Sequence, residues 1–546
     1  MNRPTRRWLA LLTLLALLIT AAGASAPAGL ARSETSTQVA GIDVDATTIP
    51  QLEALMDAHR LSSVQLVQFY LHRITKLNPQ LNAVITVSPT ALADARAADR
   101  ARRGGDDRPL LGIPVIVKDN VDTTGMPTTA GSWALAGSTP SDAFIVQRMR
   151  AAGAIIIAKA NLSEWANFRS GPSSSGWSWI GGQTNMAYVL DRNPCGSSSG
   201  TGVAVSADLA TVGVGTETDG SIVCPSGANG LAGIKPTLGL LSRAGVVPIS
   251  ADQDTAGPMA RNVTDAAALL GAMTGVDPAD AATAAQTGHA FTDYTQFLDA
   301  DALDGARIGV LHEGTVFPPD AKTPEVDAIM ADTIATLTAH GATIVDPADI
   351  HLGAWSDAEF PALLCEFKTD IASYLATYTA AGYPKTLEDL INFNEAHKDL
   401  EGPSDTAGIP WNNLLFELAQ ETGGRADPAC QAARATATSG ARAAIDAVMT
   451  ANDLDAIIGP TNSPAWKTDP ENGDDLSIFV GSSSPAAVSG YPSITVPAGF
   501  VGPLPVGVSF IGARWDEPTL IGLAYALEQA SHVRTPPTFL PTTTLP

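Results

Sequence analysis

The sequence predicts an α/β protein with a large mixed, mostly parallel β-sheet core covered by helices on both faces. Up to residue 345, short runs rich in β-branched residues alternate with helix-like segments, which is the rhythm of β-α-β units. The 546 residues are 45% hydrophobic and 16% charged, so a large buried core is possible and wholesale disorder is excluded. At about 150 residues per domain the length allows several domains, but one large domain with an appended lobe fits equally well.

The periodicity of apolar residues locates the main elements. Apolar residues recur at helical spacing in 63–76, behind a serine cap. A second helix is predicted over 143–151, with Asp142 as its N-cap, and a final one over 519–531. Strands are predicted at 114–117, 154–158, 306–311, 342–345, 455–458, 493–496 and 505–511.

A helical lobe interrupts the strand pattern. Residues 320–450 contain four long helix-like segments, at 324–340, 361–377, 386–397 and 432–450. We therefore predict a single domain over 27–535, with this lobe inserted before the last strands. The tail, 536–546, is rich in Thr and Pro and is predicted to be loosely ordered.

The N-terminus has the pattern of an export signal. Arg3, Arg6 and Arg7 precede an apolar run from Trp8 to Thr20, and small residues at 22–24 offer a cleavage site. The run is shorter than the ~20 residues a membrane span needs, so no stable membrane anchor is expected. We predict a cleaved signal within 1–26 and a secreted or periplasmic protein. The paired arginines leave the Sec and twin-arginine routes both open.

The charge and the cysteines exclude other classes. The net charge of −24 repels phosphate backbones, so nucleic acid is not an expected partner. No CxxC pair occurs, which argues against structural zinc. The four cysteines (Cys195, Cys224, Cys365 and Cys430) allow three pairings in an exported protein. Cys365 with Cys430 is the favoured pair, because the other two cysteines flank candidate active-site serines.

The densest Gly/Ser run, at 193–202, allows three interpretations. A flexible linker is disfavoured because a buried type of helix follows at once. A phosphate loop needs Gly-Lys-Ser/Thr, and no lysine is present. A nucleophile elbow centred on Ser198 fits G-x-S-x-G, but the preceding residues make a poor strand and the downstream histidines have no distinctive setting.

Two further segments carry reactive groups. Residues 215–222 form a Gly-rich turn after an apolar run, and consecutive N–H groups before Ser221 could converge on one point. Lys118 ends an apolar strand, where desolvation lowers the pKa of an amine and makes it a possible general base. Lys159 and Lys235 lie in similar apolar settings, so composition alone does not choose among the three lysines.

In these segments the chain resembles the amidase signature family. The resemblance rests on 196–202, 215–222 and the Lys118 strand, and continues through 233–237, 254–259, 490–493 and 505–510. It extends from about Ser62 to the final helix. The spellings of 195–200 and 216–222, together with 366–368 and 392–394, are most similar to those of bacterial peptide amidases.

The resemblance implies a Ser-Ser-Lys triad. Ser221 would be the acyl-forming nucleophile, Ser197 the bridging serine and Lys118 the base, with a cis peptide bond associated with Ser197. Ser198 and Ser199 would then be supporting residues. The candidate oxyanion donors are the backbone N–H groups of Thr218, Asp219, Gly220 and Ser221. This chemistry requires no metal or organic cofactor.

The resemblance also implies an activity, with one departure from the family pattern. Asp219 replaces the first of two glycines before the nucleophile, and we expect its carboxylate to point away from the oxyanion. The expected function is hydrolysis of linear carboxamides, in particular C-terminal peptide amides, by an exported enzyme. The alternatives are a broad aliphatic, aryl or fatty-amide amidase and a non-catalytic exported binding protein. A tRNA amidotransferase subunit is disfavoured by the signal and the acidity, and the oligomeric state stays open.

Overall fold

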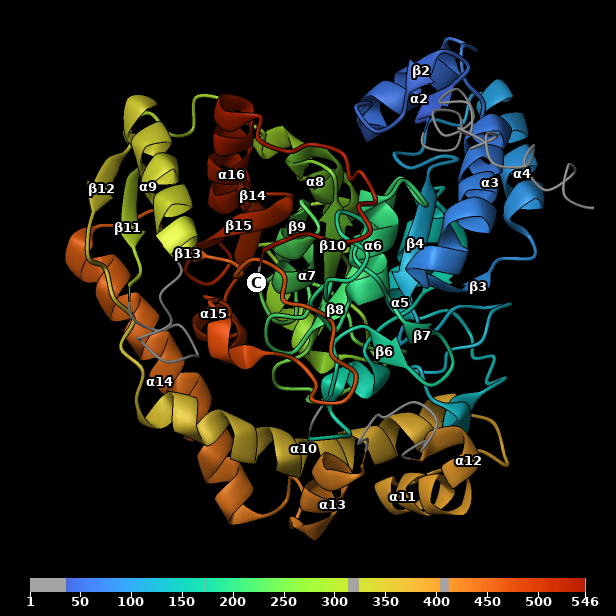
Figure 1. The fold of residues 1–546 in the computed structure, drawn as a ribbon, viewed down its shortest axis with the longest axis vertical. Helices are drawn as coiled ribbons and strands as arrows, with labels where there is room; N and C mark the ends of the chain where they lie inside the picture. The colour runs from blue at the N-terminus through green and yellow to red at the C-terminus, as the bar shows by residue number, and fades with distance from the viewer. Residues whose placement is uncertain (1–35, 172, 313–323, 403–411, 546) are drawn as a thin grey trace, which may run out of the picture.

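An 11-stranded sheet forms the centre of the computed structural model, which describes residues 36–171, 173–312, 324–402 and 412–545 (Figure 1). Across the sheet the order is β12 (Thr343–Val345), β11 (Arg307–Val310), β13 (Ala456–Pro460), β15 (Leu504–Ile511), β14 (Ser493–Val501), β9 (Ala232–Lys235), β10 (Thr255–Ala260), β8 (Val212–Glu217), β4 (Pro114–Lys118), β5 (Ile155–Ala160) and β3 (Val84–Val87). All seven predicted strands are therefore present, with four more between or beside them.

The sheet is mixed, as predicted, but four of the ten pairs among its described strands are parallel, not most of them, and these four are confined to two flanks. Strands β12, β11 and β13 run parallel on one side, and β8, β4 and β5 run parallel on the other. The pairs from β13 to β8 through the centre are antiparallel, as is β3 at the edge. The central pattern includes the hairpin of β14 and β15, because a short turn can only return a strand in the antiparallel direction.

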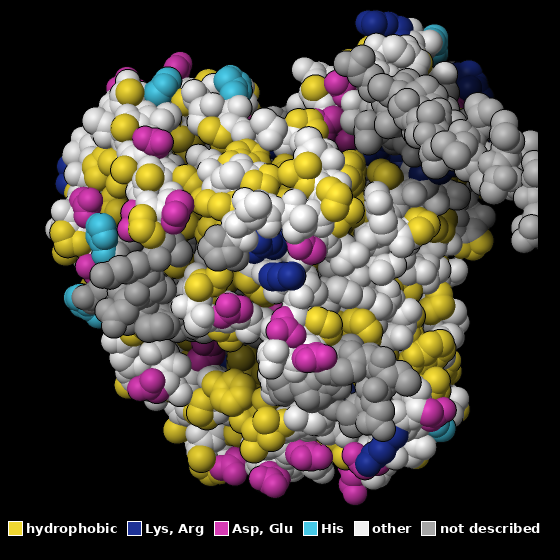
Figure 2. Space-filling model, viewed as in Figure 1, with side chains coloured by type: hydrophobic (Ala, Val, Ile, Leu, Met, Phe, Trp, Pro, Cys, Tyr) yellow, Lys and Arg dark blue, Asp and Glu magenta, His cyan; other side chains and the backbone are white. Residues whose placement is uncertain are grey.

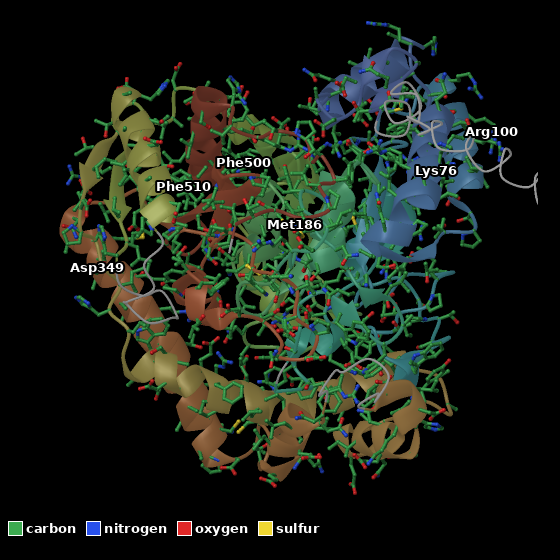
Figure 3. All side chains as sticks on the ribbon, in the orientation of Figure 1. Lys76, Arg100, Met186, Asp349, Phe500 and Phe510 are labelled. Atoms are coloured by element: carbon green, nitrogen blue, oxygen red, sulfur yellow. A yellow bond between two sulfur atoms is a disulfide. The ribbon has the colours of Figure 1, made fainter. Side chains whose placement is uncertain are left out.

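Helices cover both faces of this sheet. They are α2 (Ile49–Asp57), α3 (Ser63–Leu81), α4 (Ala91–Arg103), α5 (Phe144–Ala151), α6 (Ser199–Ser206), α7 (Val223–Ala228), α8 (Val263–Met273), α9 (Pro324–Ala339), α15 (Ser484–Ser489) and α16 (Glu517–Ser531). Helix α6 lies close to β8 because Gly213 has no side chain: a Cβ there would be 2.6 Å from Thr201 Cγ2. Phe510 and Met186, both fully buried, lie in the interior, whereas Lys76 and Arg100 lie at the periphery (Figure 3).

A helical lobe runs along one end of the molecule (Figure 1), but it is smaller than predicted, because α9, the first of the four helices expected in it, packs on the sheet. It consists of α10 (Ala354–Tyr378), α11 (Leu387–Ala396), α12 (Lys398–Glu401), α13 (Leu414–Glu421) and α14 (Pro428–Asn452). Its two long helices are joined by a buried ion pair, in which Arg434 of α14 contacts both oxygens of Glu366 on α10 at 2.8 and 2.7 Å. In the part of the chain that the structure describes, no helix is long and apolar enough to cross a membrane.

Two local predictions are wrong. Asp142 does not cap α5: its carboxylate instead accepts hydrogen bonds from Thr124 N at 2.7 Å and Arg150 Nε at 2.9 Å. The C-terminal tail is not loose, because Leu540 forms a β-bridge with Val189 and its N–H bonds a neighbouring carbonyl at 3.1 Å. Long-range partners decide both outcomes, and neither is visible in the local sequence.

The molecular surface is mixed in character. On the face shown in Figure 2, acidic side chains are scattered among apolar and uncharged ones, and basic side chains are few. The predicted signal within 1–26 lies outside the described residues. The first described elements are the short pair β1 (Gln38–Val39) and β2 (Ile42–Asp43), followed by α2.

Candidate active site

The topology brings the three predicted catalytic residues to one end of two neighbouring strands. Lys118 is the last residue of β4, and β8 pairs with β4 in parallel. Ser221 follows the end of β8, and Ser197 precedes α6, which packs on both strands. Carboxyl ends of parallel strands meet at the same edge of a sheet, so the spacing in sequence becomes proximity in space.

Lys118 is fully buried and held by hydroxyl and carbonyl oxygens. Its Nζ lies 2.7 Å from Ser197 Oγ, 2.9 Å from Thr216 Oγ1 and 3.3 Å from Thr216 O. Asn120 Nδ2 donates to the same Thr216 hydroxyl at 2.9 Å. Burial lowers the pKa of Lys118 to about 7, although the negative charges of Asp254 and Glu217 act in the opposite direction. A neutral amine is therefore accessible near neutral pH.

The structure distinguishes Lys118 from the two other buried lysines. Burial lowers the pKa of Lys159 too, but its amine forms an ion pair with Asp119 at 3.4 Å and donates to Val121 O and Thr128 Oγ1, and to no described serine. Lys235 Nζ donates to Pro236 O at 3.1 Å and bonds no described serine. Among the described lysines, only Lys118 has its amine on a serine hydroxyl, so geometry makes the choice that composition left open.

The three adjacent serines have different roles. The peptide bond between Gly196 and Ser197 is cis, as the family resemblance implied, and Ser197 Oγ faces Lys118. Ser198 Oγ donates to Thr216 O at 3.0 Å and accepts from Thr216 N at 3.2 Å. Ser199 Oγ donates to Cys195 O at 2.6 Å. Ser198 is thus engaged with the backbone of β8 and is not an exposed elbow nucleophile.

The turn before Ser221 presents unused backbone donors. The N–H groups of Thr218, Asp219, Gly220 and Ser221 form no hydrogen bond with any described residue. The next two, Ile222 N and Val223 N, donate to the buried Glu217 carboxylate at 2.7 and 3.0 Å. The four N–H groups expected as oxyanion donors therefore all lack a partner among the described residues.

A disulfide joins the two serine loops. Cys195 is bonded to Cys224, so the favoured pairing of Cys365 with Cys430 is wrong; both of those thiols are free. Cys195 and Cys224 were not expected to pair because they flank the candidate serines. The fold brings these two loops together, and the two cysteines are bonded there. Ser198 N also donates to Ser221 O at 3.2 Å. The structure shows no hydrogen bond between the Ser197 and Ser221 hydroxyls, a contact that substrate-free enzymes often complete only in the complex.

The carboxylate of Asp219 is directed to the start of α15. It accepts hydrogen bonds from Ser483 Oγ at 2.5 Å and Ser484 Oγ at 2.6 Å. The carboxylate therefore holds the turn from the side, as expected for a negative charge next to an oxyanion. Thr218 is fixed as well, because its hydroxyl donates to Asp254 at 2.6 Å.

Several residues of the site were not anticipated from the sequence. Thr216 hydrogen-bonds the amine of Lys118, and Asn120 hydrogen-bonds Thr216. Glu217 accepts from the N–H group of Ile222, and Ser483 donates to Asp219. For Thr216 and Glu217 a signal existed, since both belong to the same turn as Ser221. Ser483 lies hundreds of residues away, and nothing in its local sequence marks it.

Proteins similar to this chain in sequence and in fold include amidases. The Amidase family model matches residues 65–521. A probable amidase of Arabidopsis thaliana is 39% identical over 514 residues, covering 91% of this chain and 92% of the relative. The native peptide amidase of Stenotrophomonas maltophilia superimposes with a TM-score of 0.84 at 47% identity, covering 90% of this chain and 99% of the other.

The chain belongs to the amidase signature family. An amidase family protein from Bacillus anthracis has the same fold, with a TM-score of 0.80 and 32% identity over 91% of this chain and 93% of that one. Another solved structure similar to this chain is that of the peptide amidase PAM with the competitive inhibitor chymostatin, at 48% identity, a TM-score of 0.85 and coverage of 90% and 99%. The protein is thus an amide hydrolase with bacterial peptide amidases among its near relatives.

Proposed function

We propose that this amidase is exported and hydrolyses C-terminal amides of peptides through an acyl-enzyme on Ser221. The observation that carries the proposal is the hydrogen bond of 2.7 Å between the buried amine of Lys118 and Ser197 Oγ, beside a turn with four free N–H groups. The substrate class is supported by the likeness to peptide amidases, and export by the basic and apolar N-terminal pattern.

The hydrogen-bond partners of the Lys118 amine are consistent with a role as general base. A neutral amine has two N–H donors and one lone pair. In its base form the amine donates one N–H group to Thr216 O, which can only accept, and the other to Thr216 Oγ1, which also accepts from Asn120. The lone pair then faces the hydroxyl of Ser197. In this state Ser197 donates to Lys118 and can accept the proton of the attacking serine.

The chemical steps follow from this arrangement. Ser221 Oγ attacks the amide carbonyl while its proton passes to Ser197 and the Ser197 proton passes to Lys118. The negative charge on the carbonyl oxygen is stabilised by N–H groups of the turn. Collapse of the tetrahedral intermediate breaks the C–N bond, and the Lys118 ammonium returns a proton through Ser197 to the departing nitrogen. A water molecule, activated by the same relay, then releases the acid and restores Ser221.

The direct test is ammonia release from a panel of amides. Peptide amides are compared with free Gln and Asn, fatty amides and aryl amides, and we expect peptide amides to have the highest kcat/KM. Ser221→Ala should abolish turnover, whereas Ser439→Ala, an exposed serine on α14, should leave it unchanged. Preference for a fatty or aryl amide would replace the proposed substrate class. Absence of turnover on every amide would favour a non-catalytic binding protein.

A further inference from the structure

One buried side chain connects the catalytic turn with the helical lobe. Gln253 Nε2 donates to Thr218 O at 3.0 Å and to Glu359 Oε1 at 2.6 Å. Thr218 is one of the four residues of the oxyanion turn, and Glu359 belongs to α10. Because one nitrogen contacts both oxygens, the Glu359 carboxylate lies a single amide group away from the turn that would hold the substrate carbonyl.

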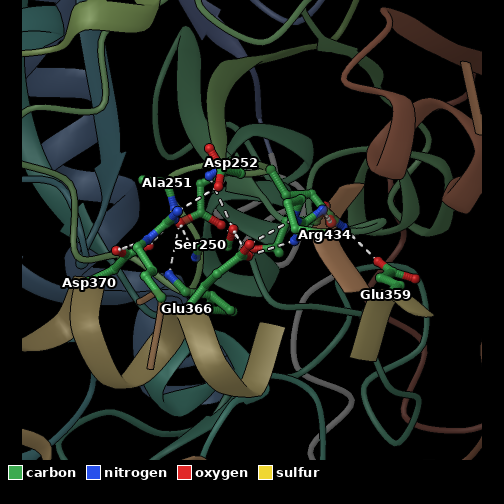
Figure 4. Close-up of polar contacts among 12 residues, drawn as sticks. Ser250, Ala251, Asp252, Glu359, Glu366, Asp370 and Arg434 are labelled. Carbon is green, nitrogen blue, oxygen red and sulfur yellow. Dashed lines mark hydrogen bonds and ion pairs between the residues drawn. The ribbon is translucent and has the colours of Figure 1, made fainter. Parts of the chain in front are cut away.

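The side chain of Gln253 is itself held in place by further hydrogen bonds. Arg434 donates to Gln253 Oε1 at 2.8 Å and is itself held by both oxygens of Glu366, which also accepts from Ser250 Oγ at 2.6 Å. Figure 4 shows Arg434 lying between Glu366 and Glu359. Every polar atom of the Gln253 side chain is therefore engaged, so the position of Glu359 is set by a rigid network and not by its own helix alone.

Glu359 differs from the rest of this network in its exposure. Gln253 and Glu366 are each 2% exposed, whereas Glu359 is only half-buried. Its Oε1 accepts from Gln253, but its Oε2 forms no hydrogen bond with any described residue. The arrangement leaves one carboxylate oxygen available at a fixed place beside the catalytic turn.

We propose that Glu359 is a specificity-determining residue that binds a cationic amino group of the substrate. The inference rests on the proposed amidase function of the Ser221 site and narrows its substrate class. The α-ammonium of an amino-acid amide is two bonds from the carbonyl carbon, and that of a short peptide amide is a few bonds further. The favoured substrates are amino-acid amides and short peptide amides with a free amino group.

The electrostatic surroundings make this preference depend on pH. The charged groups that act on Glu359 are Asp219 in the turn and Arg434 on α14. Burial and the nearby Asp219 raise the pKa of Glu359 to about 8, while Gln253 and Arg434 oppose the increase. A cation therefore binds more tightly as the pH rises through this range and the carboxylate forms.

The test compares two peptide amides that differ only at the amino terminus. One has an acetyl group, and the other a trimethylammonium group, which keeps its charge at every pH. We expect wild-type enzyme at pH 9 to favour the cationic substrate in kcat/KM by about tenfold, mostly through KM, from the Coulombic attraction of one half-buried charge pair, because a trimethylammonium group has no N–H to donate. This ratio should fall as the pH is lowered through about 8.

The decisive variant is Glu359→Gln, which can still accept from Gln253 but has no charge. Its activity on the acetyl substrate should be close to wild type, and its ratio should fall to about one at all pH values. Asp357→Asn, an exposed residue on the same helix, should retain the wild-type ratio. An unchanged ratio in Glu359→Gln would overturn the inference, as would a wild-type ratio near one. Failure of both substrates with wild-type enzyme would instead refute the proposed peptide-amidase function.

Discussion

Replacement of Lys118 by Met should abolish catalysis and at the same time stabilise the fold. The side chain is fully buried, and burial lowers its pKa from 10.5 to about 7. Keeping a lysine in this environment at pH 7 costs about 5 kcal/mol relative to a solvated ammonium. Methionine removes that cost but also removes the hydrogen bonds of the amine to Ser197 and Thr216, a loss of about 3 kcal/mol. The free energy of unfolding should rise by about 2 kcal/mol.

The pH dependence gives the sign of the effect. Because the folded-state pKa of Lys118 is depressed, the folded protein binds fewer protons than the unfolded chain between pH 7 and 10.5. The contribution of Lys118 to the free energy of unfolding therefore increases with pH across this window, and Lys118→Met should remove that part of the slope. Urea unfolding at a series of pH values measures it.

The same pKa predicts the kinetics. The kcat/KM of wild-type enzyme on a neutral peptide amide should fall tenfold per pH unit below about 7, so activity at pH 5 should be about 100-fold below its plateau. Lys118→Met should lose at least a factor of roughly 10²–10⁴, the usual contribution of a general base. A profile that stays flat down to a pH of about 4, or a Lys118→Met variant that is less stable and still active, would refute the role given to this amine.

Three further outcomes follow from other contacts. Asp254→Asn should move the acidic limb of the kcat/KM profile to lower pH, because the Asp254 charge raises the pKa of Lys118; an unchanged or higher limb contradicts this. Replacing Cys195 and Cys224 with serine should lower the free energy of unfolding by about 3–4 kcal/mol, as measured in urea, since their bond closes a loop with a separation of 29 residues. Equal stability would show that the bond adds nothing. Gly213→Ala should cost about 1–3 kcal/mol and lower activity, because its Cβ would lie 2.6 Å from Thr201. Gly353→Ala, with open space and an extended φ of 176°, is the matched control and should be neutral in thermal unfolding.

The fold could be predicted because its signals are local, whereas the triad residues were assigned through the family resemblance. Alternation of β-branched strands with helix-like segments predicted the mixed α/β sheet, and the turn around Ser221 carried its donors in consecutive residues. The identity of the catalytic lysine was harder to predict from the sequence. Lys118, Lys159 and Lys235 look alike in sequence, and only Asp119 beside Lys159 and Ser197 beside Lys118 separate them in space.

The features that were missed depend on partners distant in sequence. Asp142 has the sequence position of a helix cap, but its carboxylate accepts hydrogen bonds from Thr124 and Arg150 instead. The tail looked loose because composition does not reveal that Leu540 pairs with Val189. The parallel flanks were inferred from β-α-β rhythm, but the antiparallel centre was not; it includes the pairing of β14 with β9, which are separated in sequence by the helical lobe.

Covalent labelling of the nucleophile would probe the relay itself. A serine-directed sulfonyl fluoride reacts without needing the correct amide, and the modified peptide can be located by mass spectrometry while the rate is followed against pH. The structure predicts a single adduct on Ser221, forming with an acidic limb near pH 7 and slowed strongly in both Ser197→Ala and Lys118→Met. Labelling at Ser198, or labelling of Ser221 at a rate indifferent to Lys118, would contradict the proton path from Ser221 through Ser197 to the buried amine.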